Sequence, residues 1–180
     1  AAANLYVADT QNNAIRLYVV ATGAVTTLTG SATGLNGNAN GVGTAATFFH
    51  PDGIVANAAG TTLYVADTFN HLIRQIAITA GPVATVTTLA GSGTATHADG
   101  TGVLASFSSP QGLTLDGAGN VLVTGTNSHT IRSITPGGVV TTVAGTANSS
   151  GTTNGLSTAG AKFNFPSGIA YSAGINTTYV

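Results

Sequence analysis

Short apolar and β-branched stretches, one of which alternates with polar residues at 71–76, follow one another along the chain, separated by turns rich in Gly, Pro, Asn and Asp. Residues 63–66 (Leu-Tyr-Val-Ala), 71–76 and 86–89 are three of them. Their Val, Ile and Thr favour pleated strands, because β-branched side chains pack well on a sheet. Residues 116–120 (Asp-Gly-Ala-Gly-Asn) supply turn chemistry. No window has a helical apolar period free of Gly and Pro, so the pattern predicts an all-β protein.

This strand pattern repeats with a step of 58 residues. Residues 5–10 return as 63–68 and, in degraded form, as 121–126, and a further copy begins at 178–180. Arg16, Arg74 and Arg132, each preceded by Ile, keep the same step. Several columns in one register indicate a genuine internal repeat. We therefore predict a single repeat array over residues 1–180, divided into repeat 1 (5–62), repeat 2 (63–120) and repeat 3 (121–178).

Each unit is predicted to contain four short antiparallel strands, the first of which follows a Pro-x-Gly motif. These first strands are residues 54–56, 113–115 and 169–171. A sheet this small cannot bury its apolar faces alone, and sheets repeated at a fixed period stack around an axis as the blades of a β-propeller. We expect the Gly-, Thr- and Ser-rich connections to lie across the blades and to insert Phe48, Phe107 and Phe163 into apolar gaps.

Three units do not close a ring, since propellers have about four to eight blades, and the array is therefore predicted to be partial or open. Its ends would present bare blade faces and an unpaired strand edge. Either the polypeptide is longer, or copies join end to end, with residues 166–171 of one copy completing the blade that the next copy starts at Leu5. Two copies that close would form a six-bladed ring, whereas open association would form a fibril.

Charge is scarce along the chain. Four Lys and Arg and five Asp and Glu make up 5% of the residues, where about 25% is usual. So few basic residues exclude a nucleic-acid partner and a polybasic membrane contact. No apolar run approaches the roughly 20 residues of a membrane helix. A surface rich in hydroxyl groups and poor in charge lacks the usual colloidal protection, and we expect burial in an assembly, attached glycans, or both.

An Asn-His-Leu tripeptide lies in the second repeat, at Asn70, His71 and Leu72. The third repeat keeps the histidine as His129, and the first has Asn13 in its place. On these columns the chain resembles NHL-repeat β-propellers, and its long connections resemble the long-repeat form common in bacterial secreted proteins. The resemblance implies a propeller fold and an extracellular or cell-surface location. The family includes scaffolds, ligand-binding modules, RNA-binding domains and an amidating lyase, so the resemblance does not fix the function.

Acids and arginines at equivalent positions are expected to tie strands together. A recurring Asp–Arg or Arg–backbone bond is predicted, and an ion pair of this kind would be costly to break and not catalytic. Gly125 replaces the aspartate in repeat 3, so Arg132 must find another acceptor. The predicted structural motif comprises Asp9, Arg16, Asp67, Asn70, His71, Arg74, His129 and Arg132.

The remaining polar residues do not form a recognisable catalytic or metal-binding pattern. His50, His71, His97 and His129 lack the short spacing of metal ligands, and every acid is an aspartate. Asp99 before Gly100 fits a turn better than a calcium site. No serine lies in a nucleophile elbow. We therefore predict no enzyme activity, no catalytic or metal residues and no cofactor.

Two sequons, at Asn148 and Asn176, make glycans a candidate partner, although chance alone gives roughly three such triplets in this composition. The sequence predicts a non-enzymatic extracellular structural repeat protein, whose copies assemble head to tail through open blade ends into a larger ring or fibril. The alternatives are a ligand- or partner-binding propeller module of a longer secreted protein and, less favoured, a lyase-like propeller enzyme that needs bound metal.

Overall fold

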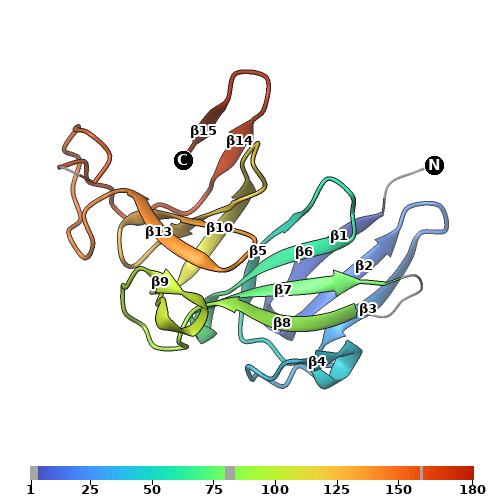
Figure 1. Ribbon diagram of the computed structural model, residues 1–180. Coiled ribbons are helices and arrows are strands. Elements are labelled where there is room, and N and C mark those ends of the chain that lie inside the picture. The colour runs from blue at the N-terminus through green and yellow to red at the C-terminus, as the bar shows by residue number, and fades with distance from the viewer. Residues whose placement is uncertain (1–3, 80–83, 159) are drawn as a thin grey trace.

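The computed structural model describes residues 4–79, 84–158 and 160–180. Within these ranges the chain forms antiparallel sheets joined by turns and by single-turn 3-10 helices, with no α-helix (Figure 1). The sheets lie one after another in an open array that does not close into a ring. The predicted all-β class and the partial, open propeller are confirmed.

Three sheets and a hairpin account for the strands, and we call them blades 1 to 3 and the C-terminal hairpin. Blade 1 has the order β1-β2-β3, blade 2 the order β4-β8-β7-β6-β5 and blade 3 the order β10-β11-β12-β13-β9. The strands are β1 (Leu5–Asp9), β2 (Ala14–Val19), β3 (Ala24–Gly30), β4 (Gly41–Val42), β5 (Pro51–Ala56), β6 (Thr62–Asp67), β7 (Leu72–Ile78), β8 (Ala84–Ala90), β9 (Gly100–Thr101), β10 (Pro110–Leu115), β11 (Val121–Gly125), β12 (Thr130–Ile134), β13 (Val139–Ala144), β14 (Ala170–Ser172) and β15 (Thr177–Tyr179). The 3-10 helices are η1 (Thr10–Asn12), η2 (Gly43–Ala45), η3 (Thr68–Asn70) and η4 (Gly102–Leu104).

The four strands predicted for a unit are present in blades 2 and 3, and the connection adds a fifth. The two-residue strands β4 and β9 come from the connections and pair with the outer strands β8 and β13. A strand of two residues, one of them Gly, leaves no alternating pattern to detect. The connections are thus integral to the sheets, in keeping with the expectation that they lie across the blades.

Strand register repeats from blade to blade as the sequence columns do. Residue Val55 pairs with Tyr64 in blade 2, Thr114 with Leu122 in blade 3, and Ala170 with Tyr179 in the hairpin. The hairpin therefore has the register of the first two strands of a blade. A register shift also recurs at each Ile-Arg step, where the outer strand gains one residue.

The core lies between blades rather than within one. One buried cluster joins blade 1 to blade 2 around Ile15, Phe48 and Val86, and the other joins blade 2 to blade 3 around Ile73, Phe107 and Val140. Each such side chain contributes about 1.5–3 kcal/mol when it is fully buried. Because both faces of blade 2 are covered by neighbours, the folding energy comes from stacking blade on blade.

The innermost strands approach so closely that glycine is required between them. A Cβ on Gly53 would lie 2.1 Å from the carbonyl oxygen of Gln111, and one on Gly112 would lie 2.1 Å from that of Ser167. These glycines belong to the Pro-x-Gly motifs at the start of β5 and β10. The motif therefore sets the spacing of blades near the axis.

Candidate functional site

The motif residues of repeat 2 form a buried ion pair. Arg74 Nη1 lies 2.7 Å from Asp67 Oδ2, and both side chains are fully buried. Asp67 also accepts hydrogen bonds from the Phe49 backbone amide, at 2.7 Å, and from Asn70 Nδ2, at 2.9 Å. In blade 1 the equivalent Arg16–Asp9 pair is longer, at 3.3 Å, and about one third exposed. The structure thus brings together the acids and arginines that the repeat columns align.

Arg132 finds its acceptor in the connection before its own blade. Its Nη2 lies 2.5 Å from Asp99 Oδ1 and donates to the carbonyl oxygen of Ala98, and its Nη1 donates to that of Ser106. Asp99 and Asn40 occupy one repeat column, and Arg74 makes the matching bond to Asn40 Oδ1 at 2.8 Å. Asp99 is the other acceptor that Arg132 was expected to find, because Gly125 replaces the aspartate of its repeat. Sequence reasoning missed Asn40 and Asp99 as partners, although an Asx-Gly step marks both positions.

Both arginines hold the connection against the blade. The guanidinium carbon of Arg74 lies 5.3 Å from the centroid of the Phe48 ring, and that of Arg132 lies 5.2 Å from Phe107. Phe48 and Phe107 are fully buried. Each arginine is therefore enclosed between an aromatic ring and backbone carbonyls, where its role is to fix the chain path.

The histidine column fastens one blade to the next. His71 Nδ1 accepts a hydrogen bond from the Ser109 backbone amide, at 3.2 Å, and His129 Nδ1 accepts one from Phe165. In repeat 1, Asn13 Oδ1 accepts a hydrogen bond from the His50 backbone amide, at 2.8 Å. These acceptors, and the three residues that donate to them, all have left-handed backbones with φ between 49° and 59°. Asn is well suited to the position because it tolerates this conformation.

The donors in this column were not identified from the sequence. Each of His50, Ser109 and Phe165 directly precedes a proline, where an extended backbone is the usual preference. The hydrogen bond to the preceding blade offsets the cost of the left-handed conformation, which is on the order of 1–3 kcal/mol. Only the fixed position before Pro-x-Gly signals these residues in the sequence.

Electrostatic surroundings shift several motif groups. Burial raises the pKa of the Asp67 carboxyl, against the hydrogen bonds from Phe49, Asn70 and Arg74. Burial lowers the pKa of His71 and so favours the neutral ring, whose Nδ1 accepts the hydrogen bond from Ser109. Burial opposes ionisation of Asp99, but the bonds from Thr142 and Arg132 together hold the pKa of Asp99 below its usual value.

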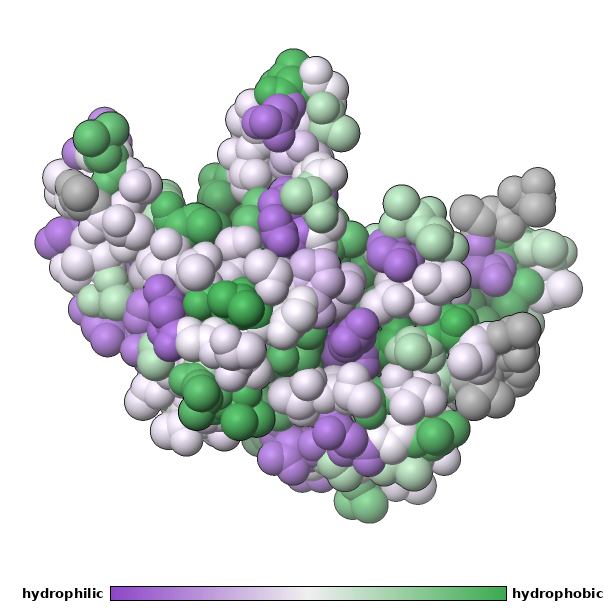
Figure 2. Space-filling model, in the orientation of Figure 1, coloured by the Kyte–Doolittle hydropathy of each residue, from purple (hydrophilic) through white to green (hydrophobic). Residues whose placement is uncertain are grey.

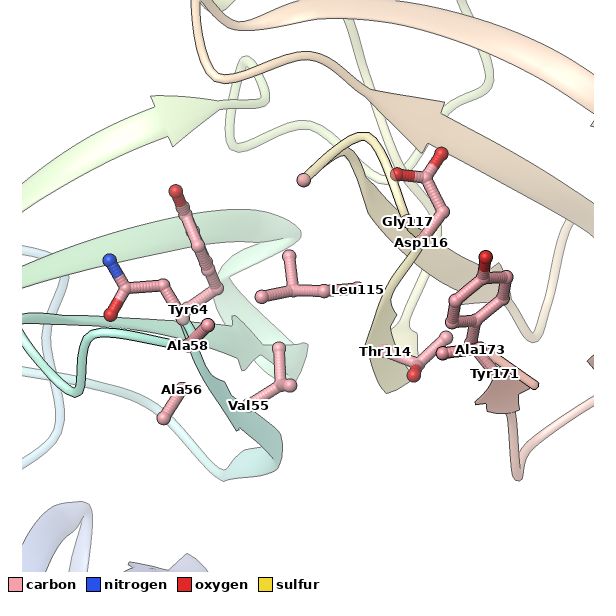
Figure 3. Close-up of a pocket in the computed structure, with 12 residues that line it drawn as sticks. Val55, Ala56, Ala58, Tyr64, Thr114, Leu115, Asp116, Gly117, Tyr171 and Ala173 are labelled. Atoms are coloured by element: carbon pink, nitrogen blue, oxygen red, sulfur yellow. The ribbon is translucent and has the colours of Figure 1, made fainter. Parts of the chain in front are cut away.

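A groove of about 540 Å³ lies where the innermost strands end. Figure 3 shows Val55, Ala58 and Tyr64 on one side, Leu115 between them and Asp116, and Asp116 beside Tyr171 on the other. Its polar side chains come from the turns after β5 and β10 (Asn57 and Asp116) and from strands β6, β10 and β14 (Tyr64, Thr114 and Tyr171). The slight burial of the Asp116 carboxyl favours a higher pKa. Hydrogen bonds from Asn120 and Ala118 outweigh it and lower the pKa of Asp116.

The other candidate chemistry is dispersed. Among the described residues no three His, Cys, Asp or Glu side chains gather where they could hold a metal ion. His97 contacts the Thr142 hydroxyl, and Asp99 is occupied by Arg132 and Thr142. The two sequon asparagines, Asn148 and Asn176, are exposed. In the same described ranges we find no helix long and apolar enough to cross a membrane.

Blade 1 exposes the apolar face that blades 2 and 3 bury. Leu63, Val65 and Val86 of blade 2 are at most 1% exposed. The residues in the same columns of blade 1 are exposed by 53% at Leu5, 45% at Val7 and 56% at Val25. We call this surface, completed by the partly buried Tyr18, the blade-1 face.

At the other end, a groove of about 400 Å³ separates blade 3 from the C-terminal hairpin. Figure 2 shows the hairpin projecting beside a hollow with apolar residues on its floor. Its lining consists of Leu122, Ile131, Val143, Ala144, Phe163, Thr178 and Val180, and we call it the blade-3 groove. Phe163 is only partly buried, unlike Phe48 and Phe107, so its expected insertion into an apolar gap is incomplete.

Known proteins share this repeat and fold. Residues 27–156 match the family model described as the SMP-30/gluconolactonase/LRE-like region. NHL repeat-containing protein 2 of Bos taurus is 35% identical over 135 residues, which are 71% of this chain and 18% of that protein. The chloroplastic protein SUPPRESSOR OF QUENCHING 1 of Arabidopsis thaliana is 33% identical over 136 residues, 72% of this chain and 12% of its own length. The chain thus spans less than a fifth of these relatives.

Solved structures agree on the architecture. An auxiliary nutrient binding protein of Bacteroides thetaiotaomicron has a TM-score of 0.78 at 22% identity, over 97% of this chain and 42% of that one. One from Bacteroides ovatus has a TM-score of 0.77 at 25% identity, over 98% and 42%. A luciferin-regenerating enzyme shares the fold at a TM-score of 0.52 and 12% identity, over 88% and 39%. These names include an enzyme and binding proteins, so the comparisons establish fold and family rather than activity. The chain belongs to the SMP-30/gluconolactonase/LRE-like family, as an array of NHL-type propeller blades.

Proposed function

We propose that this chain is a non-enzymatic structural propeller module whose copies join through their open blade ends into a larger ring or fibril. The observation that carries the proposal is the blade-1 face. Its columns are buried wherever another blade precedes them, and Leu5, Val7 and Val25 are about half exposed here. Covering these side chains would contribute on the order of 5 kcal/mol before the entropy of association is subtracted.

The state of the motif residues supports a structural role. Asp67 and Arg74 are fully buried and bonded to each other and to the connection. His71 and His129 accept backbone hydrogen bonds from the next blade. These groups are the most chemically capable ones in the repeat, and each is engaged in holding blades together.

Sedimentation velocity over a range of concentrations tests the association. We expect species heavier than the 17.5 kDa chain, with a share that grows with concentration. Val25→Asp places a charge in the blade-1 face and should raise the dissociation constant at least tenfold. Thr26→Asp adds the same charge at the neighbouring exposed position on the opposite face of β3 and should change it little. A wild-type chain that sediments as a monomer at every concentration would contradict the proposal.

The same proposal places the protein outside the cell or at its surface. Only 5% of its residues are charged, and its exposed sequons at Asn148 and Asn176 are available to glycans. Fractionation of the source cells and intact-mass measurement of the native protein test both points. Protein recovered only from the cell interior would contradict the location, and an unmodified mass would contradict glycosylation.

A binding module is the second candidate, favoured by the groove at the ends of the innermost strands. Its apolar floor, with Tyr64 and Leu115, and its differing turns suit a small ligand. Two similar structures are named as auxiliary nutrient binding proteins. A thermal-shift screen of monosaccharides, amino acids and short peptides tests this function. Ala58→Trp should fill the groove and abolish any shift, whereas Ala59→Trp, exposed outside the lining, should retain it. Equal shifts in both variants would contradict a site in this groove.

A further inference from the structure

The contact between blades 2 and 3, which we call the 2–3 seam, depends on an acceptor that can be protonated. His71 Nδ1 accepts a hydrogen bond from the Ser109 backbone amide, at 3.2 Å. Because Nδ1 is the acceptor, the neutral ring carries its proton on Nε2. A second proton can bind only at Nδ1, and the imidazolium that results is a donor at both nitrogens. The bond to Ser109 and a protonated His71 ring therefore exclude each other.

The same bond keeps Ser109 in a backbone conformation that its sequence opposes. Ser109 has a φ of 49° and precedes Pro110, where an extended backbone is preferred. Thr68 Oγ1 donates to the carbonyl oxygen of Pro110, at 2.8 Å, in a buried part of the seam. A relaxation of Ser109 would therefore also move the start of β10 away from blade 2.

The contact between blades 1 and 2, the 1–2 seam, has the same bond without an ionisable acceptor. Asn13 Oδ1 accepts from the His50 backbone amide, at 2.8 Å. His50 matches Ser109 in its backbone, since it has a φ of 57° and also precedes a proline. A side-chain amide does not gain a proton in mild acid. The two seams thus differ in whether acid can remove the acceptor.

The surroundings of His71 offer no charge that would stabilise an imidazolium in place. The charged and titratable groups on the neighbouring elements are Asp67 and Arg74 of blade 2, and His97, Asp99 and Arg132 of the following connection and blade 3. Both aspartates are paired with an arginine. Burial alone lowers the pKa of His71, and none of these groups contributes to the shift. The ring is therefore easier to protonate when the seam is open than when it is closed.

We propose that His71 makes the 2–3 seam open locally in mild acid, whereas Asn13 leaves the 1–2 seam insensitive to acid. In the open state the His71 ring holds a second proton from solvent, and the Ser109 amide is released to water. The open population grows as the pH falls, because only the open state takes up the proton readily. The device acts within one chain and does not depend on self-association.

Amide hydrogen exchange, resolved by residue with NMR, tests the proposal on the 180-residue protein. After correction for the ordinary pH dependence of exchange, the protection of the Ser109 amide should fall at least about fivefold between pH 7 and pH 5. The upper limit is about 25-fold, which a free imidazole with its ordinary pKa of about 6.5 would set. The His50 amide in the same sample is the control, and its protection should change by less than about twofold.

Exchanging the two acceptors provides matched variants, since each introduces a residue that the chain already uses in this column. His71→Asn should remove the acid effect at the Ser109 amide, and Asn13→His should create one at the His50 amide. Constant protection of Ser109 in the wild type, or an equal fall at Ser109 and His50, would overturn the proposal. If a variant does not fold, the comparison of the two amides in the wild type still decides it.

Discussion

At the scale of residues, one glycine per repeat fixes how closely the blades approach. Gly53 faces the backbone carbonyl of Gln111 in β10, and Gly112 faces that of Ser167 shortly before β14, so that a methyl group fits at neither position. Gly168 holds the same position in the third Pro-x-Gly motif, and no atom of the described chain lies within 4 Å of its Cβ position. Two of the three equivalent glycines are therefore closely packed against backbone, and the third has open space at its Cβ position.

We therefore predict opposite results for one substitution at two equivalent positions. Gly53→Ala should lower the free energy of unfolding by at least about 2 kcal/mol, because backbone rather than a movable side chain opposes the methyl group. Gly168→Ala should change it by less than about 0.5 kcal/mol. Urea denaturation at low protein concentration measures both, and equal losses would show that the innermost strands do not meet as described.

Removing the aspartate of the ion pair should destabilise the protein more in blade 2 than in blade 1. Asp67→Ala leaves the fully buried Arg74 without its carboxylate and should cost about 3–5 kcal/mol of unfolding free energy. Asp9→Ala breaks a longer, partly exposed pair and should cost no more than about 1 kcal/mol. Denaturant midpoints of the two variants check this, and a small loss for Asp67→Ala would contradict the buried pair.

A pH dependence follows from His71. Burial lowers the pKa of His71 in the folded state, so the unfolded chain binds more protons at mildly acidic pH. Its stabilising contribution is complete above its ordinary pKa of about 6.5 and is lost as the pH falls through the folded value. We expect His71→Asn, which introduces the residue that repeat 1 has at Asn13, to keep the bond to Ser109 and to reduce the loss of stability between pH 7 and 5.

Burial also lowers the pKa of His97, so the wild type and the His71→Asn variant both lose stability at acidic pH through His97. The wild type is therefore the reference, and the loss due to His71 is the difference between the two proteins. Denaturation curves at pH 7 and pH 5 for both proteins supply the measurement. An unchanged difference between the two pH values would contradict the role of the neutral His71 ring.

At the scale of elements, the connections are anchored parts of the blades. Phe107 is fully buried beneath Arg132, whereas Phe163 lines an open groove. Phe107→Ala should therefore cost about 3–5 kcal/mol of unfolding free energy. Phe163→Ala should cost clearly less in the monomer, as measured by thermal unfolding at low concentration. Similar losses would mean that the groove is closed without a partner.

Much of the strand arrangement was predictable from the sequence, for a physical reason. Strands and their register follow from alternation and from columns that recur every 58 residues, so Leu63 and Val121 could be aligned directly. The path of a connection follows from no such period. The bond from Arg132 to Asp99 joins a strand to a connection 33 residues away in the sequence, and the left-handed Ser109 opposes the usual preference before proline. Tertiary contacts determine both, and they were found only in the structure.

At the scale of the whole molecule, stability comes from stacking similar sheets, and within the described residues blade 1 keeps an apolar face exposed. The sequence predicted the open ends from the blade count alone. It did not reveal which side chains of the blade-1 face are exposed, because burial at each column has to be measured. Self-association, as proposed above, requires that the stack continue from one copy to the next.

Electron microscopy of the purified 180-residue protein tests that claim most directly. The account predicts particles with more than three blades around a common axis, either rings formed from two copies or fibrils of successive copies. Isolated arcs of three blades at every concentration would contradict it.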